Sequence, residues 1–449
     1  MLHPTRAAPE LSDDVGPRAR LPRLPAPPPI EPDDRSAEDR GAEDRGVEDR
    51  GVELAGPGTA PAYPDRSTGL AKFHVPEIVF GPHALAELGH CALRVGARRP
   101  FLVTDPGIVA AGWAAEAVDH LRGAGLQPVV WSEVTPNPKD GEIAAAYEHY
   151  LDSGADVILA VGGGSCIDAA KGVAILSSNG GTILGYAGVD KVVQPIPPLV
   201  MAPSTSGTGA DVSQFAVITD TERHIKITII SRTLVPEISV IDPRLLTTMP
   251  EELNAATGLD ALTHAVEAYV SRAHNRLTDH HALHAAHLIT GNLRDTTLQP
   301  RRAAPRIGMA QGALEAGMAF TNAILGITHA MSHQVGGLLD APHGVLNGVL
   351  LPHAIRFNAA EDPHRYVPLA AAVGIDVEGR PADEVADGLA SFIRTLADDV
   401  GVPKGLSDLG VSEADLPTLA RTTLADACLA TNPREVDIAD VFALFRQAL

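Results

Sequence analysis

The chain has 449 residues, of which 45% are hydrophobic, and its formal net charge at pH 7 is -21. That length is sufficient for two domains with sizeable hydrophobic cores. The strongly negative charge argues against nucleic acid and anionic membranes as partners, because both require a basic face on the protein.

The cysteines and the apolar runs indicate the cellular compartment. Cys91, Cys166 and Cys428 have no paired spacing, which is typical of a reducing environment without a disulfide framework. No apolar run reaches membrane-spanning length, and the N-terminus lacks the build of a secretory signal. We therefore expect a cytoplasmic protein.

The first 67 residues differ in composition from the rest. PRLPAPPPIEPDD is rich in proline, and AEDRGAEDRGVEDRGVE repeats a charged five-residue unit interrupted by glycine. Neither segment offers an apolar face to bury, so residues 1–67 are predicted to be a disordered, low-complexity tail without a catalytic role.

Strand and helix patterns alternate over residues 69–245. Short apolar runs in FHVPEIVFG, RRPFLVTD, VVWSEV and VILAVGGGS predict strands. HALAELGHCALRVG, GWAAEAVDHLRGAG and KDGEIAAAYEHYLDSG have helical spacing and end at glycine. This alternation predicts an α/β domain with a parallel sheet and crossover helices.

A dinucleotide site is predicted where VILAVGGGSCIDAAKGVAIL passes from a strand through glycines into a helix. The backbone N–H groups of Gly163, Gly164 and Ser165 would meet a pyrophosphate at the positive end of that helix. Tight packing alone is the alternative, since the GxGxxG fingerprint is absent. PSTSGTGADVSQF adds hydroxyls on a second loop, and Asp105 ends the strand FLVTD. A carboxylate there accepts ribose hydroxyls and disfavours a 2'-phosphate, which favours NAD over NADP.

From about Pro250 onwards the strand patterns end and alanine-rich helical patterns take over. We therefore predict an all-helical domain over residues 246–449. The cleft between the two domains is expected near Asp242 and Pro243.

A metal site is predicted from GLDALTHAVEAY and GITHAMSHQVGGLLDAPHG. Asp260 and His264 are four residues apart, as are His329 and His333, so each pair shares a helix face. His343 would complete the group from a loop. A single histidine in such helices is usually packed or solvated, but the whole group favours a metal. Imidazoles with one carboxylate suit Fe²⁺ or Zn²⁺.

Another histidine group lies between these two segments. His280, His284 and His287 fall on one helical face, with His274 and His281 nearby. No carboxylate is spaced to join them as neatly, and SRAHNRLTD is typical of a turn followed by a helix N-cap. We predict a partly exposed helix here rather than a second metal site.

Taken in order, GGGSCIDAAK, PSTSGTGAD, ATGLDALTHAVEAYVS, GITHAMSH, DAPHGVLNGVLLPH and ACLATNPRE resemble the iron-containing (group III) alcohol dehydrogenase family. The resemblance runs from about Phe73 to Leu449 and is strongest to lactaldehyde reductase-like and ethanol-oxidation-associated members. It implies a dehydroquinate synthase-like fold, with a Rossmann-like N-terminal domain and an all-helical, metal-binding C-terminal domain. It also implies a homo-oligomer.

The resemblance assigns roles to particular residues. It implies that the metal ligands are Asp260, His264, His329 and His343, whereas His333 lies near the nicotinamide and acts in catalysis. It implies that NAD is bound by Asp105, Asn137, Gly163, Gly164, Ser165, Asp168, Ser204, Thr205, Thr208 and Lys226. The expected metal is one divalent ion, Fe²⁺ before Zn²⁺.

These residues predict a metal-dependent alcohol dehydrogenase that transfers hydride between NAD and a small primary alcohol or its aldehyde. Phe320, Leu325 and Leu338 are candidates for lining an apolar substrate pocket. Two alternatives stay open: a regulatory or sensor protein on the same fold, and a metal-dependent lyase of the dehydroquinate synthase type. The lyase is less favoured, because its polyanionic substrate requires Lys and Arg residues that are scarce near the metal-binding motifs.

Overall fold

The first half of the described chain is built on a parallel β-sheet. The computed structural model describes residues 72–223, 225–299 and 302–449, so the tail predicted over residues 1–67 lies outside the described residues. The six strands of the sheet are, in spatial order, β1 (Glu77–Phe80), β9 (Ile238–Ile241), β6 (Leu199–Pro203), β4 (Val157–Gly162), β2 (Pro100–Val103) and β3 (Val129–Trp131).

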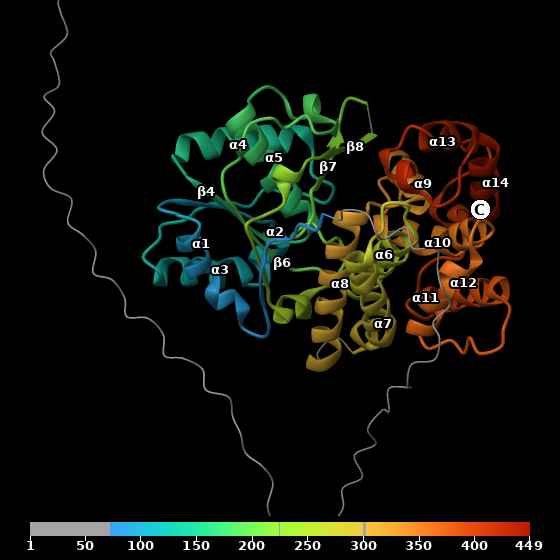
Figure 1. Cartoon of the computed structure of the whole chain (residues 1–449). Helices are drawn as coiled ribbons and strands as arrows, with labels where there is room; N and C mark the ends of the chain where they lie inside the picture. Colours follow the sequence, from blue (N-terminus) through green and yellow to red (C-terminus); the bar gives the residue numbers. More distant parts are fainter. Residues whose placement is uncertain (1–71, 224, 300–301) are drawn as a thin grey trace, which may run out of the picture. The chain divides into compact units, whose positions relative to one another are not determined.

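Helices cover both faces of this sheet. Helices α4 (Asp140–Ser153) and α5 (Gly164–Asn179) pack on one face, and α1 (Leu88–Arg94) and α3 (Trp113–Gly123) pack on the other (Figure 1). Every residue of β4 is buried, as expected for a strand covered on both sides. The structure thus confirms the predicted parallel sheet with crossover helices.

A small second sheet projects from this layer. It consists of β5 (Gly188–Val189), β8 (Ile225–Ile230) and β7 (Phe215–Asp220), with β7 and β8 paired as an antiparallel hairpin. The sequence pattern did not predict these strands. Their burial mixes buried and half-buried residues, so the alternation typical of a half-buried strand is weak.

After β9, the described residues form helices and 3-10 turns without a further strand, which confirms the predicted helical second half. The long helices are α6 (Glu251–Val270), α7 (Arg276–Leu298), α8 (Ala303–Ala323), α9 (Ile327–Leu339), α10 (His343–Ala359), α12 (Ala382–Asp399) and α14 (Ile438–Ala448). The shorter elements of the chain are α2 (Pro106–Ala110), α11 (Val367–Ala372), α13 (Leu416–Thr423), η2 (Ala84–Glu87), η3 (Ile183–Tyr186), η4 (Arg232–Leu234), η5 (Pro243–Thr248), η6 (Pro363–Tyr366), η7 (Leu406–Leu409) and η8 (Ala427–Thr431).

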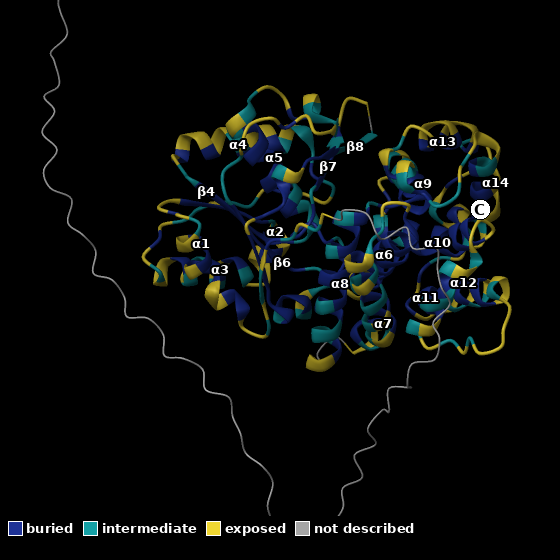
Figure 2. Ribbon diagram, viewed as in Figure 1, coloured by how far each residue is buried: buried dark blue, intermediate teal, exposed yellow. Residues whose placement is uncertain are grey.

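Helix α6 is the centre of the helical portion. It is buried without interruption from Asn254 to Val270, and α7, α8 and α10 pack around it. Figure 2 shows exposed residues on outer elements such as α4 and α13. A polar side chain on α6 therefore lies in the interior, where it needs a partner or a ligand.

The predicted helix of the second histidine group is α7. Asn275 caps it, accepting hydrogen bonds from the backbone N–H groups of Leu277 and Thr278. This confirms the turn and N-cap expected from SRAHNRLTD.

The division into domains over residues 69–245 and 246–449 stays a prediction. Within the described residues, every helix falls short of the length or apolar content that a bilayer crossing requires.

Candidate active site

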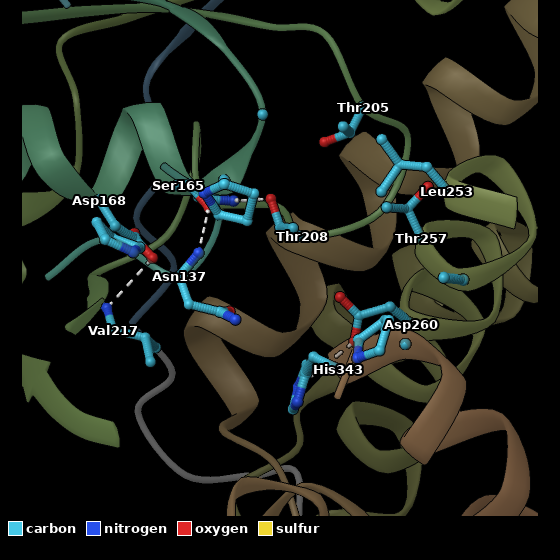
Figure 3. Close-up of a pocket in the computed structure, with 18 of the residues that line it drawn as sticks. Asn137, Ser165, Asp168, Thr205, Thr208, Val217, Leu253, Thr257, Asp260 and His343 are labelled. Carbon is cyan, nitrogen blue, oxygen red and sulfur yellow. Dashed lines mark hydrogen bonds and ion pairs between the residues drawn. The ribbon is translucent and has the colours of Figure 1, made fainter. Parts of the chain in front are cut away.

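A cavity of about 900 Å³ opens at the carboxyl edge of the parallel sheet. Asp105, Gly163 and Ser204 line it, and they follow β2, β4 and β6 closely in the chain. Ligands of open α/β sheets bind at this edge. The opposite wall comes from α6, α8, α9 and the start of α10, so the cavity joins the sheet to the helical portion. Figure 3 shows Asp260 and His343 of this wall together with Ser165 and Thr208 of the other. Its volume is at the upper end of the range of ~300–1,000 Å³ usual for ligand pockets.

The glycine-rich turn brings α5 against a second loop. Gly163 is the N-cap of α5, so the N–H groups of its first turn face the cavity edge. A Cβ on Gly164 would lie 2.8 Å from Thr208 Cγ2, and a Cβ on Gly163 would lie 3.2 Å from Thr205 Cγ2. The glycines are therefore required for the close approach of the hydroxyl-bearing loop. Thr205 Oγ1 is buried and has no hydrogen-bond partner among the described residues, which leaves it available to a ligand.

A buried lysine fixes that second loop. Lys171 is fully buried, and its Nζ donates to the carbonyl oxygens of Ala210, Ser213 and Phe215 at 2.7, 2.7 and 2.8 Å. Burial raises the pKa of the nearby Asp168, and the charge of Lys171 opposes that rise. Asp168 Oδ2 accepts from the N–H of Val217 at 3.2 Å. These bonds explain why a lysine follows the glycine turn in this motif.

Asn137 connects the two walls of the cavity. Its Oδ1 accepts from Lys226 Nζ at 2.9 Å, and its Nδ2 donates to Asp340 Oδ1 at 2.5 Å. Its backbone N–H donates to Ser165 Oγ at 3.2 Å. Asp340 ends α9, so one side chain bridges the α/β portion and the helical portion.

An aspartate and three histidines converge at the other end of the cavity. The Nε2 atoms of His264, His329 and His343 lie 3.8, 3.6 and 3.7 Å from Asp260 Oδ1. Ligand atoms around a tetrahedral ion with bonds of 2.0–2.2 Å are separated by about 3.5 Å. The ligand atoms of Asp260, His329 and His343 all lie within 4.8 Å of one another, which fits one divalent metal, and His264 is the fourth candidate through its 3.8 Å approach to Asp260.

The other ring nitrogen of each histidine has a partner of its own. His329 Nδ1 lies 2.7 Å from Glu267 Oε2, His264 Nδ1 lies 3.2 Å from the Gly207 carbonyl, and His343 Nδ1 lies 3.4 Å from Ser332 Oγ. Partners at Nδ1 orient each ring so that Nε2 is directed towards the common centre. Glu267 also accepts the backbone N–H groups of Gly326 and Thr328, so the start of α9 is tied to α6.

The electrostatics of this cluster favour an ionised Asp260, neutral His264 and His343, and a protonated His329. Burial raises the pKa of Asp260, but His264, His343 and His329 outweigh it and hold that pKa well below its usual range. Burial lowers the pKa of His264 to about 4 despite Asp260, and burial also lowers the pKa of His343. Burial opposes protonation of His329 as well, but its bonds to Asp260 and Glu267 raise its pKa to about 9.

Asn347 is a member of the cluster that the sequence did not reveal. It lies on α10, fully buried, and its Nδ2 donates to Asp260 Oδ1 at 2.7 Å. The same atom lies 3.3 and 3.2 Å from the Nε2 atoms of His329 and His343. It follows His343 by four residues, a spacing that places both on one helix face.

His333 belongs to a different set of contacts. Its Nδ1 lies 2.9 Å from Asp426 Oδ2, and its ring stacks on that of His343 with centroids 5.2 Å apart. The spacing of His329 and His333 in the sequence does not show which of them is the better candidate for a metal ligand. The structure separates them, because each ring binds a different carboxylate.

Every residue predicted to bind NAD or the metal lines this cavity, together with His333. Phe320 and Leu325 line it as expected. Leu338 lies outside the lining and is 50% exposed, so its assignment to the pocket is wrong; it lies on the outer side of α9. The cleft was expected near Asp242 and Pro243, but neither residue lines the cavity. Thr248 and Met249, which are later residues of the connection between β9 and α6, line it instead.

The histidines of α7 have a structural role. His284 Nδ1 lies 2.8 Å and His281 Nδ1 lies 3.7 Å from Glu315 Oε2 on α8. This carboxylate comes from another helix, which is why spacing within α7 did not predict it. His287 is exposed, in agreement with a partly exposed helix.

A cavity that joins the carboxyl edge of a parallel sheet to a buried aspartate–histidine cluster is the arrangement of a nucleotide- and metal-dependent enzyme. Residues 76–243 match the model of the family described as iron-containing alcohol dehydrogenase, and residues 254–449 match that of the C-terminal part of the Fe-containing alcohol dehydrogenase family. The chain belongs to the iron-containing alcohol dehydrogenase family.

Several relatives match nearly their whole length. 1,3-Propanediol dehydrogenase of Citrobacter freundii is 41% identical, over 82% of this chain and 96% of its own. Lactaldehyde reductase of Escherichia coli K12 is 36% identical (82% and 97%), and NAD-dependent methanol dehydrogenase of Bacillus methanolicus is 33% identical (84% and 99%). A crystal structure of 1,3-propanediol oxidoreductase superposes with a TM-score of 0.83 at 39% identity, covering 85% of this chain and all of the other.

Proposed function

We propose that this protein is an NAD-dependent alcohol dehydrogenase that interconverts a small primary alcohol and its aldehyde. The observation that carries the proposal is the single cavity in which the glycine turn after β4 and the Asp260 cluster face one another. NAD would supply the hydride acceptor, and a divalent metal, Fe²⁺ or Zn²⁺, would supply Lewis-acid polarisation of the substrate oxygen.

The chain's own residues would bind and orient these groups. Asp260, His264, His329 and His343 would hold the metal, and Glu267 would hold His329 in the required tautomer. The α5 N-terminus and the loop carrying Ser204, Thr205 and Thr208 would receive the pyrophosphate. Phe320, whose ring stacks on His264 with centroids 4.3 Å apart, and Leu325 would exclude water beside the metal.

The lyase alternative is disfavoured by the charge of the cavity. Lys226 is the only Lys or Arg among the described residues of its lining. A polyanionic substrate requires several such groups. The helical end instead places apolar residues such as Leu253, Phe320 and Leu325 beside the metal cluster, which supports a small, weakly polar substrate.

One experiment tests the function. The full chain is stripped with a chelator, reloaded with Fe²⁺ under anaerobic conditions or with Zn²⁺, and assayed for NADH formation with short primary alcohols, diols and hydroxy acids. We expect turnover that requires the metal and is highest with a small primary alcohol. A chain that binds one metal and NAD but turns over no alcohol and reduces no aldehyde would instead support the alternative of a regulatory or sensor protein on the same fold. The homo-oligomeric state and the cytoplasmic location stay predictions.

The cofactor preference is expected to depend on Asp105. Its Oδ1 caps α2 by accepting the N–H of Ile108 at 2.9 Å, and its Oδ2 accepts from the Cys166 thiol. Asp105→Asn keeps a capping oxygen but removes the charge that repels a 2'-phosphate. We expect the ratio of kcat/KM for NAD over NADP to fall by about tenfold or more. The control is Asp437→Asn, which changes the N-cap of α14 outside the cavity lining and should leave the ratio unchanged.

The carboxylate behind His329 is expected to control metal affinity. Glu267→Gln keeps the shape but weakens the bond to His329 Nδ1, so metal affinity should fall by roughly 10–100-fold. Competition against a chromophoric chelator measures this change. Glu315→Gln is a matched control, because Glu315 also pairs with histidines but lies outside the cavity lining. Equal losses in both variants would contradict the role of Glu267.

His333 is expected to act in turnover without holding the metal. His333→Ala should leave metal binding at the Asp260 cluster at the wild-type level, because none of the four cluster contacts to Asp260 involves this ring. Turnover should fall by about 10²–10⁴-fold, the range for loss of a proton-transfer group. His284→Ala serves as a control with the same substitution at a carboxylate-paired histidine of α7. Unchanged turnover in His333→Ala would refute the role.

A further inference from the structure

A second cluster of metal-ligating side chains lies beside the Asp260 cluster. His333 on α9, Asp426 before η8 and Cys428 within η8 each offer one ligand atom, and these atoms lie within 4.8 Å of one another. Asp426 Oδ2 lies 2.9 Å from His333 Nδ1, and Asp426 Oδ1 accepts the N–H of Cys428 at 2.9 Å. The ligand atoms of the three side chains therefore lie close enough together to share one ion.

The surroundings of this cluster suit a bound ion. Cys428 is buried, and His333 and Asp426 are nearly so, with side chains 10% and 12% exposed. His333 and Cys428 also line the cavity, so an ion has a path to them and a fourth ligand position can face the solvent there. Gln334 Nε2 donates to Asp426 Oδ2 at 3.3 Å, which helps to keep the carboxylate in place.

The donor set differs in chemistry from that of the Asp260 cluster. Asp260 and its histidines offer only oxygen and nitrogen, whereas Cys428 adds sulfur. A thiolate, an imidazole and a carboxylate with one open position form a set that Zn²⁺ and similar thiophilic cations prefer. The two negative charges would neutralise a divalent ion.

We propose that His333, Asp426 and Cys428 form a second divalent-metal site that takes a thiophilic cation such as Zn²⁺, Co²⁺ or Cd²⁺. On binding, the thiol proton leaves to solvent, and the single ring proton of neutral His333 sits on the nitrogen that does not face the cation. The cation thereby gains a thiolate, a carboxylate and a neutral imidazole. If the proposed function holds, occupancy of this site takes His333 out of proton transfer, so excess Zn²⁺ inhibits the iron-loaded enzyme.

Titration of the metal-free full chain with Co²⁺ tests the site. Only a site containing cysteine produces a thiolate-to-Co²⁺ charge-transfer band, so the Asp260 cluster is silent in this measurement. We expect wild type to bind two Co²⁺ per chain and to develop the band. Cys428→Ser should bind one Co²⁺ and show no band. Cys91→Ser is the matched control: Cys91 is a buried free thiol on α1 outside the cavity lining, and this variant should behave as wild type.

Two more variants keep the test decisive. If Cys428→Ser does not fold, Asp426→Asn, which preserves shape, should likewise lose the band. Asp260→Asn should retain the band with one Co²⁺ per chain, which separates this site from the one required by the proposed function. A wild-type protein without a thiolate band would overturn the proposal. So would a band that survives in Cys428→Ser, because it would have to come from another thiol such as Cys166 beside Asp105.

Discussion

Asp260→Asn is expected to abolish metal binding at the Asp260 cluster while leaving the fold intact. The Asp260 carboxylate lies within 3.8 Å of three imidazole Nε2 atoms and supplies the only negative charge among the four proposed ligands. An asparagine keeps the shape but removes that charge, so a divalent ion would face only neutral donors in a buried site. A metal ion contributes several kcal/mol to catalysis. Turnover should therefore fall by about 10³-fold or more.

Metal analysis after dialysis, together with the change in Tm on adding metal, measures this effect. Wild type should gain stability in the presence of metal, because a ligand that binds only the folded state stabilises it. Asp260→Asn should hold one metal ion fewer per chain than wild type and should lose the gain in Tm that this ion provides. Asp279→Asn is the matched control: Asp279 also lies beside a histidine, His274 at 3.1 Å, but on α7 outside the cavity lining. A metal content in Asp260→Asn equal to that of wild type would contradict the proposed ligand set.

Gly344→Ala is expected to disrupt both stability and the metal cluster. A Cβ at this position would lie 1.9 Å from the Ala256 carbonyl oxygen and 2.5 Å from its carbon, both in the backbone of α6. Neither atom can move aside as a flexible side chain would, so α10 must shift away from α6. The free energy of unfolding should fall by about 3 kcal/mol. His343 directly precedes this glycine, so the same shift should move it away from Asp260 and weaken metal binding.

Gly291→Ala provides the control for Gly344→Ala. Gly291 lies within α7, and a Cβ there meets no atom within 4 Å. Alanine is preferred over glycine in a helix by roughly 0.5–1 kcal/mol, so this variant should be slightly more stable than wild type. Denaturant unfolding and metal competition on both variants check the pair. A Gly344→Ala protein with wild-type stability would mean that α6 and α10 are not in close backbone contact.

Much of the architecture was predictable because it depends on local patterns. The buried strand in VILAVGGGS, the glycine turn after it and the helices of the second half follow from short-range hydrophobic spacing. The candidate cofactor and metal residues, which line one cavity, could be chosen from the sequence because several motifs occur in order. The role of Glu267 as a further member of the cluster could also have been predicted from local sequence. Asp260, His264 and Glu267 stand at positions i, i+4 and i+7 and form a polar stripe on an otherwise apolar helix. The hairpin of β7 and β8 had no such local indication, because its alternation is weak.

What the sequence by itself determined is therefore the order of strands and helices, the glycine turn and the pairs of residues that share a helix face. The tertiary structure alone decided which histidines meet. His329 and His333 lie on the same face of α9, so spacing does not distinguish them. His329 nevertheless contacts Glu267 of α6, whereas His333 contacts Asp426 in the segment after α13. Glu315 reaches the histidines of α7 in the same way, from α8. The physical reason is that periodicity fixes the direction of a side chain within one helix, whereas its partner depends on how closely two backbones approach, as at Gly344.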